Sequence, residues 1–453
     1  MREAAEHYVE GARRVTVSAT NAAPPEHGPV LRNRNFVVFF VAAVVSNSGT
    51  WMQQVAVFAL IYELSGHRGA WLGIVSLASS LPMIVLTPVA GVLADRLPRR
   101  VILTVTQLVQ ASAAFALWIL YLGDSLTAWR IVGLVFLGGI AGGFQMAAWQ
   151  AFVPTLVPRA QLVEAVRLNS LQFTVSRALG PSVGAVLVSF WGIGTAIFFN
   201  AVTYLLVVAA IFVTHANQII PTRGSRRFVS ELVEGARYVM GNSLLRLIIL
   251  FAFFLSLSGQ SIAAIAAAVA FRLYGHDAKD NAWLITALGV GALVMSVYVL
   301  LVASRFRRTV LTKAGIAIYA VGLALIPLTT NFGVGLVAYG ICGLAHVLVG
   351  TSLNTFVQAS VPDEIRGRAL SFYLLGVMLG FPVGALLIGR VGDAVGFREV
   401  MVFNVIVFSV LTYWLTHVRE YAQIDHDVIV APVRAATVPR SGRSLRSGGR
   451  SGR

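Results

Sequence analysis

Twelve apolar runs of about 20 residues each constrain the fold of this chain more than any other feature. A run of that length lets an α-helix cross the hydrocarbon core of a bilayer, where only helices and closed barrels satisfy their backbone hydrogen bonds. Hydrophobic residues make up 57% of the chain and charged residues only 12%, whereas a soluble domain carries about 25% charged residues. We therefore predict an all-α polytopic membrane protein whose twelve transmembrane helices lie near residues 36–62, 70–94, 101–122, 130–152, 168–190, 194–214, 244–271, 282–303, 309–328, 332–356, 368–390 and 399–417.

The net charge of +16 is distributed unevenly over the loops between these runs. If both termini lie in the cytoplasm, most lysines and arginines fall on the cytoplasmic side, as the positive-inside rule requires for an even number of spans. The pattern predicts a multi-pass protein of the inner (plasma) membrane, with the lipid bilayer as its partner and no nucleic-acid binding. The predicted outer loops hold only Arg68, Arg130, Arg272, Lys279, Arg390 and Arg398.

The second half of the chain repeats the first at an offset of 204 residues, so that Gly180 recurs as Gly384 and Asn200 as Asn404. Two parallel halves of six helices follow from this repeat. Between them, residues 228–240 are amphipathic, and we expect either a helix on the inner membrane surface or a solvated linker helix. The predicted parts are an N-terminal tail (1–35), a first half (36–214), a central loop (215–243), a second half (244–417) and a basic, disordered tail (418–453).

The loop between the second and third runs carries an acid and three arginines in ten residues. It reads Gly91-Val92-Leu93-Ala94-Asp95-Arg96-Leu97-Pro98-Arg99-Arg100 and resembles the G-x-x-x-D-R-x-G-R-R/K loop of the major facilitator superfamily, with Pro98 where that family has glycine. Loops 157–162 and 361–369 are similar to inner-face loops of the superfamily. The most similar branch includes enterobactin-exporter-like and macrolide-efflux-like proteins. The resemblance covers about residues 32–418 and implies the major facilitator fold and secondary transport.

We interpret this loop as a conformational latch. An ionised aspartate accepts hydrogen bonds from arginines and is favoured at a helix N-terminus. By resemblance, the latch holds the cytoplasmic ends of the halves together in an outward-facing state and releases them in an inward-facing one; the alternative is a simple positive-inside anchor. The latch residues are Gly91, Asp95, Arg96, Arg99 and Arg100, and the inner-face loop of the second half adds Asp363, Glu364, Arg366 and Arg368.

The fifth run contains the sequence Arg177-Ala178-Leu179-Gly180-Pro181-Ser182-Val183-Gly184. Proline removes a backbone donor and kinks a helix, while Gly180 and Gly184 at four-residue spacing allow a neighbouring helix to approach closely. The stretch resembles the Gly-Pro-x-x-Gly-Gly antiporter motif of exporters, with Ala185 in place of the last glycine, and we predict a gating helix formed by Arg177, Gly180, Pro181 and Gly184. An ordinary packed kink is the alternative. Arg177 itself faces protein or water and either binds an anionic substrate group, forms a conformational ion pair, or extends to the inner surface.

Several polar and aromatic side chains within the runs are candidates for lining a substrate cavity. Such a cavity is mostly apolar with few polar contacts, which suits a bulky amphipathic molecule. Each polar residue taken singly is explained equally well by hydrogen bonding between helices. The predicted cavity residues are Asn47, Trp51, Gln54, Gln145, Trp149, Gln260 and His346.

The function that these features predict is secondary active export of a small amphipathic molecule, such as a drug-like compound or a siderophore, by alternating access. The proton gradient is the expected energy source, because no Walker-type phosphate loop is present. The expected partners are a small-molecule substrate and protons, and the fold usually works as a monomer. Import of an organic solute and a non-transporting receptor are the alternatives. With Cys342 as the only cysteine and its acids dispersed, the chain is not expected to be an enzyme or to bind a metal or cofactor.

Overall fold

A computed structural model describes residues 29–94, 97–215, 228–302 and 308–417. The whole predicted C-terminal tail, most of the predicted N-terminal tail and part of the central loop lie outside these residues. Within them, twelve helical segments are long and apolar enough to cross a membrane. The predicted fold class and number of spans are therefore confirmed.

The first half contains six long helices, two of which start with a side-chain cap from the residue just before the helix. Asn33 accepts hydrogen bonds from the N–H groups of Asn35 and Phe36 (3.1 and 3.3 Å), and Thr127 accepts one from Arg130 N (3.4 Å); such caps satisfy N–H groups that have no partner inside the helix. The helices are α2 (Arg34–Leu64), α3 (Ala70–Ala94), α4 (Arg99–Leu122), α5 (Ala128–Phe152), α6 (Leu162–Trp191) and α7 (Ile193–Val213).

The second half has the same six-span plan with one interruption. The predicted seventh span, 244–271, is divided into α9 (Ser243–Ser258), a 3₁₀ turn (Gln260–Ala263) and α10 (Ala266–Tyr274). Gly259, at the break, packs against the ring of Tyr319, which leaves no room for a side chain there. The remaining helices are α11 (Asn281–Val302), α12 (Arg308–Leu328), α13 (Phe332–Ser360), α14 (Asp363–Val395) and α15 (Phe397–His417).

Helix packing repeats from one half to the other. In the first half α3 packs on α5, α2 on α6, and α4 on α7; in the second half α11 packs on α13, α9 on α14, and α12 on α15. The repeat extends to side chains: Asn200 Nδ2 on α7 donates to Gln53 Oε1 on α2 (2.7 Å), and Asn404 Nδ2 on α15 donates to Ser258 O on α9 (2.9 Å). The sequence repeat therefore corresponds to a repeat of structure.

Two spans begin earlier than hydrophobicity predicts. Helix α6 begins at Leu162 and α14 at Asp363, whereas the apolar runs begin near 168 and 368. The first turns of both helices are charged, and they remain helical because an α-helix satisfies its backbone hydrogen bonds internally in water as well as in lipid. The length of an apolar run thus gives the membrane-crossing part of a helix rather than its ends.

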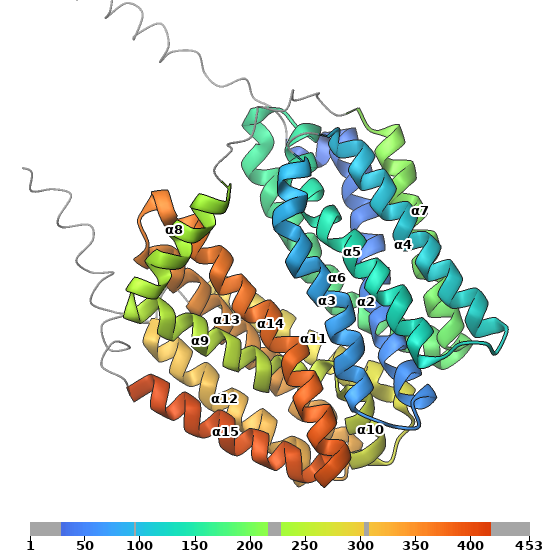
Figure 1. The fold of residues 1–453 in the computed structure, drawn as a ribbon, viewed down its shortest axis with the longest axis vertical. Helices are drawn as coiled ribbons and strands as arrows, with labels where there is room; N and C mark the ends of the chain where they lie inside the picture. The colour runs from blue at the N-terminus through green and yellow to red at the C-terminus, as the bar shows by residue number, and fades with distance from the viewer. Residues whose placement is uncertain (1–28, 95–96, 216–227, 303–307, 418–453) are drawn as a thin grey trace, which may run out of the picture.

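The two halves meet at one end of the bundle and diverge toward the other (Figure 1). We call the first the contact end; there α2, α10 and α14 end, and α3 and α11 begin. Across the halves, α3 packs on α14 and α6 on α11, two pairs that the repeat relates to each other. One hydrophobic cluster runs through both halves and includes Tyr62 and Leu72, while a second around Phe39 and Phe152 belongs to the first half.

The opposite end, which we call the tail end, is where α2 begins and α15 ends. The amphipathic stretch of the central loop forms α8 (Phe228–Gly241) at this end, against the start of α14. Arg368 Nη1 donates to Glu234 Oε2 of α8 (2.7 Å). At Gly235 an added Cβ would lie 2.9 Å from Arg368 Cβ, so the glycine permits this close approach. Helix α8 is thus attached to the second half.

Candidate functional site

The predicted latch lies at the tail end, between α3 and α4. Asp95 and Arg96 lie outside the described residues, and Gly91 stands in the last turn of α3 with open space beside it. Arg99 Nη1 donates to Ala151 O of α5 (2.9 Å). The Nε and Nη2 atoms of Arg100 are buried and have no hydrogen-bond partner among the described residues.

Arg99 and Arg100 are the first two residues of α4, and the helix dipole disfavours positive charge in this first turn. An unpartnered buried guanidinium in that position is incompletely satisfied. An acceptor brought to it in another arrangement of the halves would be bound favourably. In the arrangement described here, Arg99 forms its hydrogen bond within the first half.

The inner-face loop of the second half also lies at the tail end. Asp363 and Glu364 are the first two residues of α14. Arg366 follows in the same turn, and Arg368 binds α8 as described above. Arg368 thus links the second half to its own surface helix.

The predicted gating helix packs closely on the first helix. A Cβ added at Gly180 would lie 2.5 Å from Ser48 O and 2.7 Å from Trp51 Cβ, and one at Gly184 would lie 2.9 Å from Met52 Cγ. Pro181 lies inside α6 and is buried. The two glycines therefore form the surface on which α2 and α6 touch.

Arg177 lies in the middle of the 30-residue α6. Its side chain is half-buried, and it has no hydrogen bond or ion pair to any described residue. His346 lies in the middle of the 29-residue α13, in the other half.

The predicted cavity residues fall into groups with different surroundings. Asn47 Nδ2 donates to Ala43 O (3.0 Å) and to Gln172 Oε1 (3.2 Å), and Gln260 Oε1 accepts from Ser256 Oγ (2.8 Å). Both therefore make contacts within their own half. The members that are half-buried without a hydrogen bond to described residues are Gln54 and Gln145, together with Trp51 beside Gly180.

Trp149 and His346 differ from the rest of that group. Trp149 is buried in the core of the first half, and its Nε1 donates to Asn169 Oδ1 (3.0 Å); in this arrangement the indole is covered by protein. His346 Nδ1 is buried with no hydrogen-bond partner among the described residues, and its ring meets Tyr319 edge-on with the ring centroids 6.3 Å apart. His346 thus keeps a polar atom without a described partner midway along α13.

At the contact end, a carboxylate of one half caps a helix of the other. Asp393 near the end of α14 accepts hydrogen bonds from Gly69 N (2.7 Å) and Ala70 N (2.9 Å), at the start of α3. The N–H groups at a helix N-terminus lack partners inside the helix, and an anion there is favoured by the dipole. Asp393 therefore links the halves through charge and hydrogen bonding together.

Further contacts connect the halves nearby. Arg272 at the end of α10 donates from Nε to Tyr62 Oη (3.2 Å) and from Nη2 to His67 O (3.3 Å). The ring of His67 stacks on Phe271, with centroids 4.0 Å apart. Deeper in the bundle, Asn281 Nδ2 donates to a backbone carbonyl of α2 (3.1 Å). These contacts close the contact end around the turn between α2 and α3.

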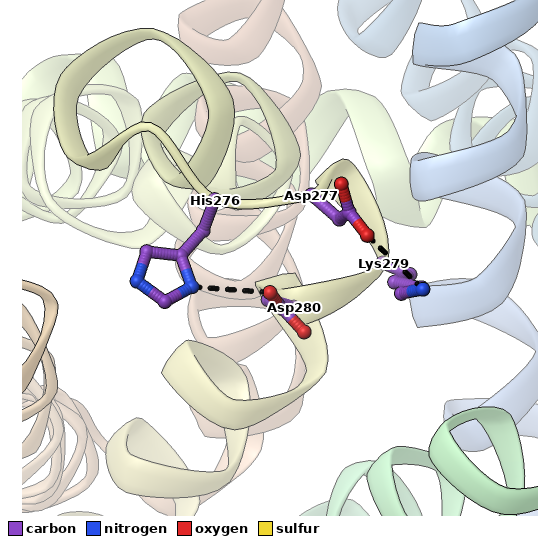
Figure 2. A network of polar contacts seen from close by, with 4 residues as sticks. All are labelled: His276, Asp277, Lys279 and Asp280. Carbon is purple, nitrogen blue, oxygen red and sulfur yellow. Dashed lines mark hydrogen bonds and ion pairs between the residues drawn. The ribbon is translucent and has the colours of Figure 1, made fainter.

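The loop between α10 and α11 is held by its own polar network (Figure 2). His276 Nδ1 lies 3.2 Å from Asp280 Oδ2, and Lys279 Nζ lies 3.0 Å from Asp277 Oδ2. The two acids precede α11, where the dipole favours negative charge. The network holds the loop in one conformation. This loop leads into α11 and packs against α2 and α6 of the first half.

The contact-end residues were not among the predicted site residues. Asp393 and Arg272 are charged residues in predicted outer loops, and charge in such loops is usually only solvated. What distinguishes Asp393 is its place in the last turn of α14, opposite the start of α3. That juxtaposition becomes visible only when the two halves are placed together.

Comparison with known proteins agrees with this architecture. The chain matches the family described as transmembrane secretion effector over residues 26–438. It is 24% identical to macrolide efflux protein A of Streptococcus pyogenes, over 80% of the chain and 90% of that protein. It is also 24% identical to the multidrug efflux pump Tap of Mycolicibacterium fortuitum, over 87% of the chain and 97% of that protein.

Solved structures show the same fold at low sequence identity. The nucleoside transporter NupG superposes with a TM-score of 0.72 at 12% identity, over 84% of the chain and 99% of that structure. A D-xylose–proton symporter superposes with a TM-score of 0.64 at 15% identity, over 83% of the chain and 97% of that structure. With its twelve spans in two repeated halves and its match over residues 26–438, the chain belongs to the transmembrane secretion effector family, in the macrolide-efflux-like branch of the major facilitator superfamily.

Proposed function

We propose that this membrane transporter exports a small amphipathic molecule from the cytoplasm by alternating access. The observation that carries the proposal is the asymmetry of the bundle: the halves are joined at the contact end and diverge toward the tail end. The efflux function of the two relatives with 24% identity supports the export direction. On this proposal the tail end faces the cytoplasm, as the basic loops favour, and the described arrangement is the one that loads substrate.

The proposed cycle exchanges one set of contacts between the halves for another. Breaking the Asp393 cap and the Arg272 contacts would free the contact end. Closing the tail end would bring the second half to the first turn of α4, where Arg100 has polar atoms without partners among the described residues. Asp95 is the proposed acid of this latch, and the Gly180–Pro181 region of α6 is the proposed gating segment.

The proton gradient is the proposed energy source. The acids that the structure describes in the spans stand near helix ends, which places the proposed proton-binding group near a membrane surface or on the substrate itself. One chain contains both halves and both kinds of contact, so we propose that the monomer is the working unit. Insertion in the plasma membrane with both termini inside follows from the charge distribution.

A susceptibility profile tests the proposal. A bacterial host lacking its major pumps would express wild type or Asp95→Asn at matched levels, and growth would be measured against macrolides, other lipophilic antibiotics and siderophores. We expect wild type to protect against at least one class of compound and Asp95→Asn to lose that protection. Protection by neither protein, or greater sensitivity with wild type, would contradict export.

A further inference from the structure

Helices α8 and α9 meet at a corner at the tail end of the second half (Figure 1). On one side of α8, Gly235 and Val239 are buried. The opposite side exposes Val233, Arg237 and Met240, which recur at spacings of four and three residues and so form one stripe along the helix. Val233 is 49% exposed and Met240 is 63% exposed. The stripe therefore presents apolar side chains on both sides of a positive charge.

The attachment of α8 to the second half has an equivalent in the first half. Glu234 on α8 accepts a hydrogen bond from Arg368 on α14, and 204 residues earlier in the sequence Val30 N donates to Glu164 Oε2 on α6 (3.2 Å). Each pair fastens the segment before the first helix of a half to the start of the fifth helix of that half. Val30 is buried in its half, whereas the stripe of α8 stays exposed. Fastening thus accounts for one side of α8 and leaves the stripe unexplained.

An open cavity of about 510 Å³ lies at the corner itself, and the described residues that line it are Tyr238, Gly241, Asn242 and Ser243. The side chains of Tyr238 and Ser243 each carry a hydroxyl that can donate. Asn242 Oδ1 accepts from Leu245 N (3.1 Å), so the amide nitrogen of this side chain is the group left to donate. Phosphate oxygens accept such hydrogen bonds, and cavities of this size hold ligands larger than a phosphoglycerol group.

The exposed face of α9 continues from this cavity into the membrane. Ser243, Arg246 and Leu250 are all exposed and lie on one face of α9, at the start of the span Ser243–Ala263. Along this face the side chains change from a hydroxyl to a guanidinium and then to an alkyl group. A phospholipid has its polar head group, phosphate and acyl chains in the same order along the membrane normal.

The charges at the corner select an anionic ligand. Neither Arg237 nor Arg246 forms a side-chain hydrogen bond or ion pair with a described residue. Glu234, the acid nearest to Arg237 along the chain, is already paired with Arg368. The C-terminal segment 418–453 is a poor occupant, because its seven arginines and three acids give it the same sign of charge as the corner.

We propose that the α8–α9 corner binds an anionic phospholipid of the leaflet at the tail end. The phosphate lies between Arg246 and the cavity, Arg237 contacts the head group, and an acyl chain lies along Leu250. Basic residues where a helix enters the membrane bind anionic lipids in this way. The inference goes beyond the proposed function and does not depend on export, since it concerns the lipid contacts of two helices whichever way a substrate moves.

Site-directed fluorescence quenching in lipid nanodiscs tests the inference on the full chain. A bimane label at Met240→Cys, in a Cys342→Ala background, would report the approach of a lipid with a doxyl quencher near its head group. Doxyl phosphatidylglycerol is compared with doxyl phosphatidylcholine, which has the same phosphate but no net charge. A basic residue near the membrane surface strengthens anionic-lipid binding about fivefold. The two arginines should therefore give half-maximal quenching at an about 25-fold lower mole fraction of the anionic lipid.

Substitutions at the corner assign this preference to its residues. Arg237→Gln and Arg246→Gln should each lower the preference about fivefold, and the double variant should remove it. Arg246→Lys keeps the charge and should retain most of the preference. The matched control is Arg130→Gln, which removes an exposed arginine from the first turn of α5 at the contact end and should leave the preference unchanged.

Three outcomes would overturn the inference. Equal quenching by the two lipids would show contact with the membrane but no selection of charge. A preference that persists in the double variant would place the anionic lipid at other residues. Absence of quenching by either lipid would place the corner in water.

Discussion

Replacing Gly73 with alanine should drive the two halves apart at the contact end. Gly73 lies in the first turn of α3, against α14 of the other half. A Cβ at this position would lie 2.6 Å from Leu386 Cβ and nearer still to the Leu386 backbone, whereas ordinary contact begins at 3.4 Å. The helices must therefore separate by at least about 0.8 Å, and backbone atoms cannot give way as a flexible side chain does.

Overpacking of this kind costs about 1–3 kcal/mol. On the proposed mechanism the cost falls only on the arrangement in which α3 and α14 touch at this end. The population of that arrangement should decrease relative to the opposite one by about 5- to 150-fold. The added methyl group would thus shift the equilibrium between the two arrangements far enough to be measured.

The assay is a distance distribution between spin labels on the two halves. Labels at Ser125 and Thr330, exposed turn residues at the contact end, would be introduced in a Cys342→Ala background. Gly73→Ala should move the distribution toward longer distances. Gly138→Ala, where an added Cβ meets nothing within 4 Å, should not. A Gly73→Ala distribution identical to that of Gly138→Ala would refute the reasoning.

Three further predictions concern other contacts. Asp393→Ala removes both acceptors of the α3 cap and, because Asp393 is exposed, should destabilise the arrangement joined at the contact end by only about 0.5–1 kcal/mol. The spin-label experiment should show the population of that arrangement falling about two- to fivefold. Asp393→Asn should lower the population less, and equal effects of the two variants would argue against a role for the charge. Asp95→Asn should insert normally and transport nothing, so wild-type efflux in that variant would exclude the latch. Gly180→Ala, whose Cβ would lie 2.5 Å from Ser48 O, should destabilise the first half by about 1–3 kcal/mol, measured as a lower Tm than that of Gly138→Ala.

Apolar run length was sufficient to predict the twelve spans, because the requirement for about 20 apolar residues leaves few alternatives. The repeat was also visible, since Asn200 and Asn404 occupy equivalent positions and make equivalent contacts. The break in the seventh span was not predicted. Gly259 stands between Ser258 and Gln260, and such small and polar residues also occur inside unbroken spans. The close approach of the Tyr319 ring to Gly259 becomes visible only when the helices are packed together.

The candidate site was only partly accessible to sequence reasoning. Arg177 and His346 stand out singly because a polar group inside an apolar run is expensive, but the surroundings of each side chain depend on how the helices pack. The Asp393 cap is invisible in the sequence for the same reason, since an acid near a span end is ordinary until its partner is known. Trp149 was grouped with polar neighbours by sequence, whereas tertiary packing buries its indole against Asn169.

The most direct test of the account is the accumulation of a labelled compound by pump-deficient cells, using the compound against which wild type protects most in the susceptibility profile. Cells with wild type should accumulate less of it than cells with Asp95→Asn at matched protein levels, and a protonophore should abolish the difference. Equal accumulation in both, or greater accumulation with wild type, would contradict proton-driven export by alternating access.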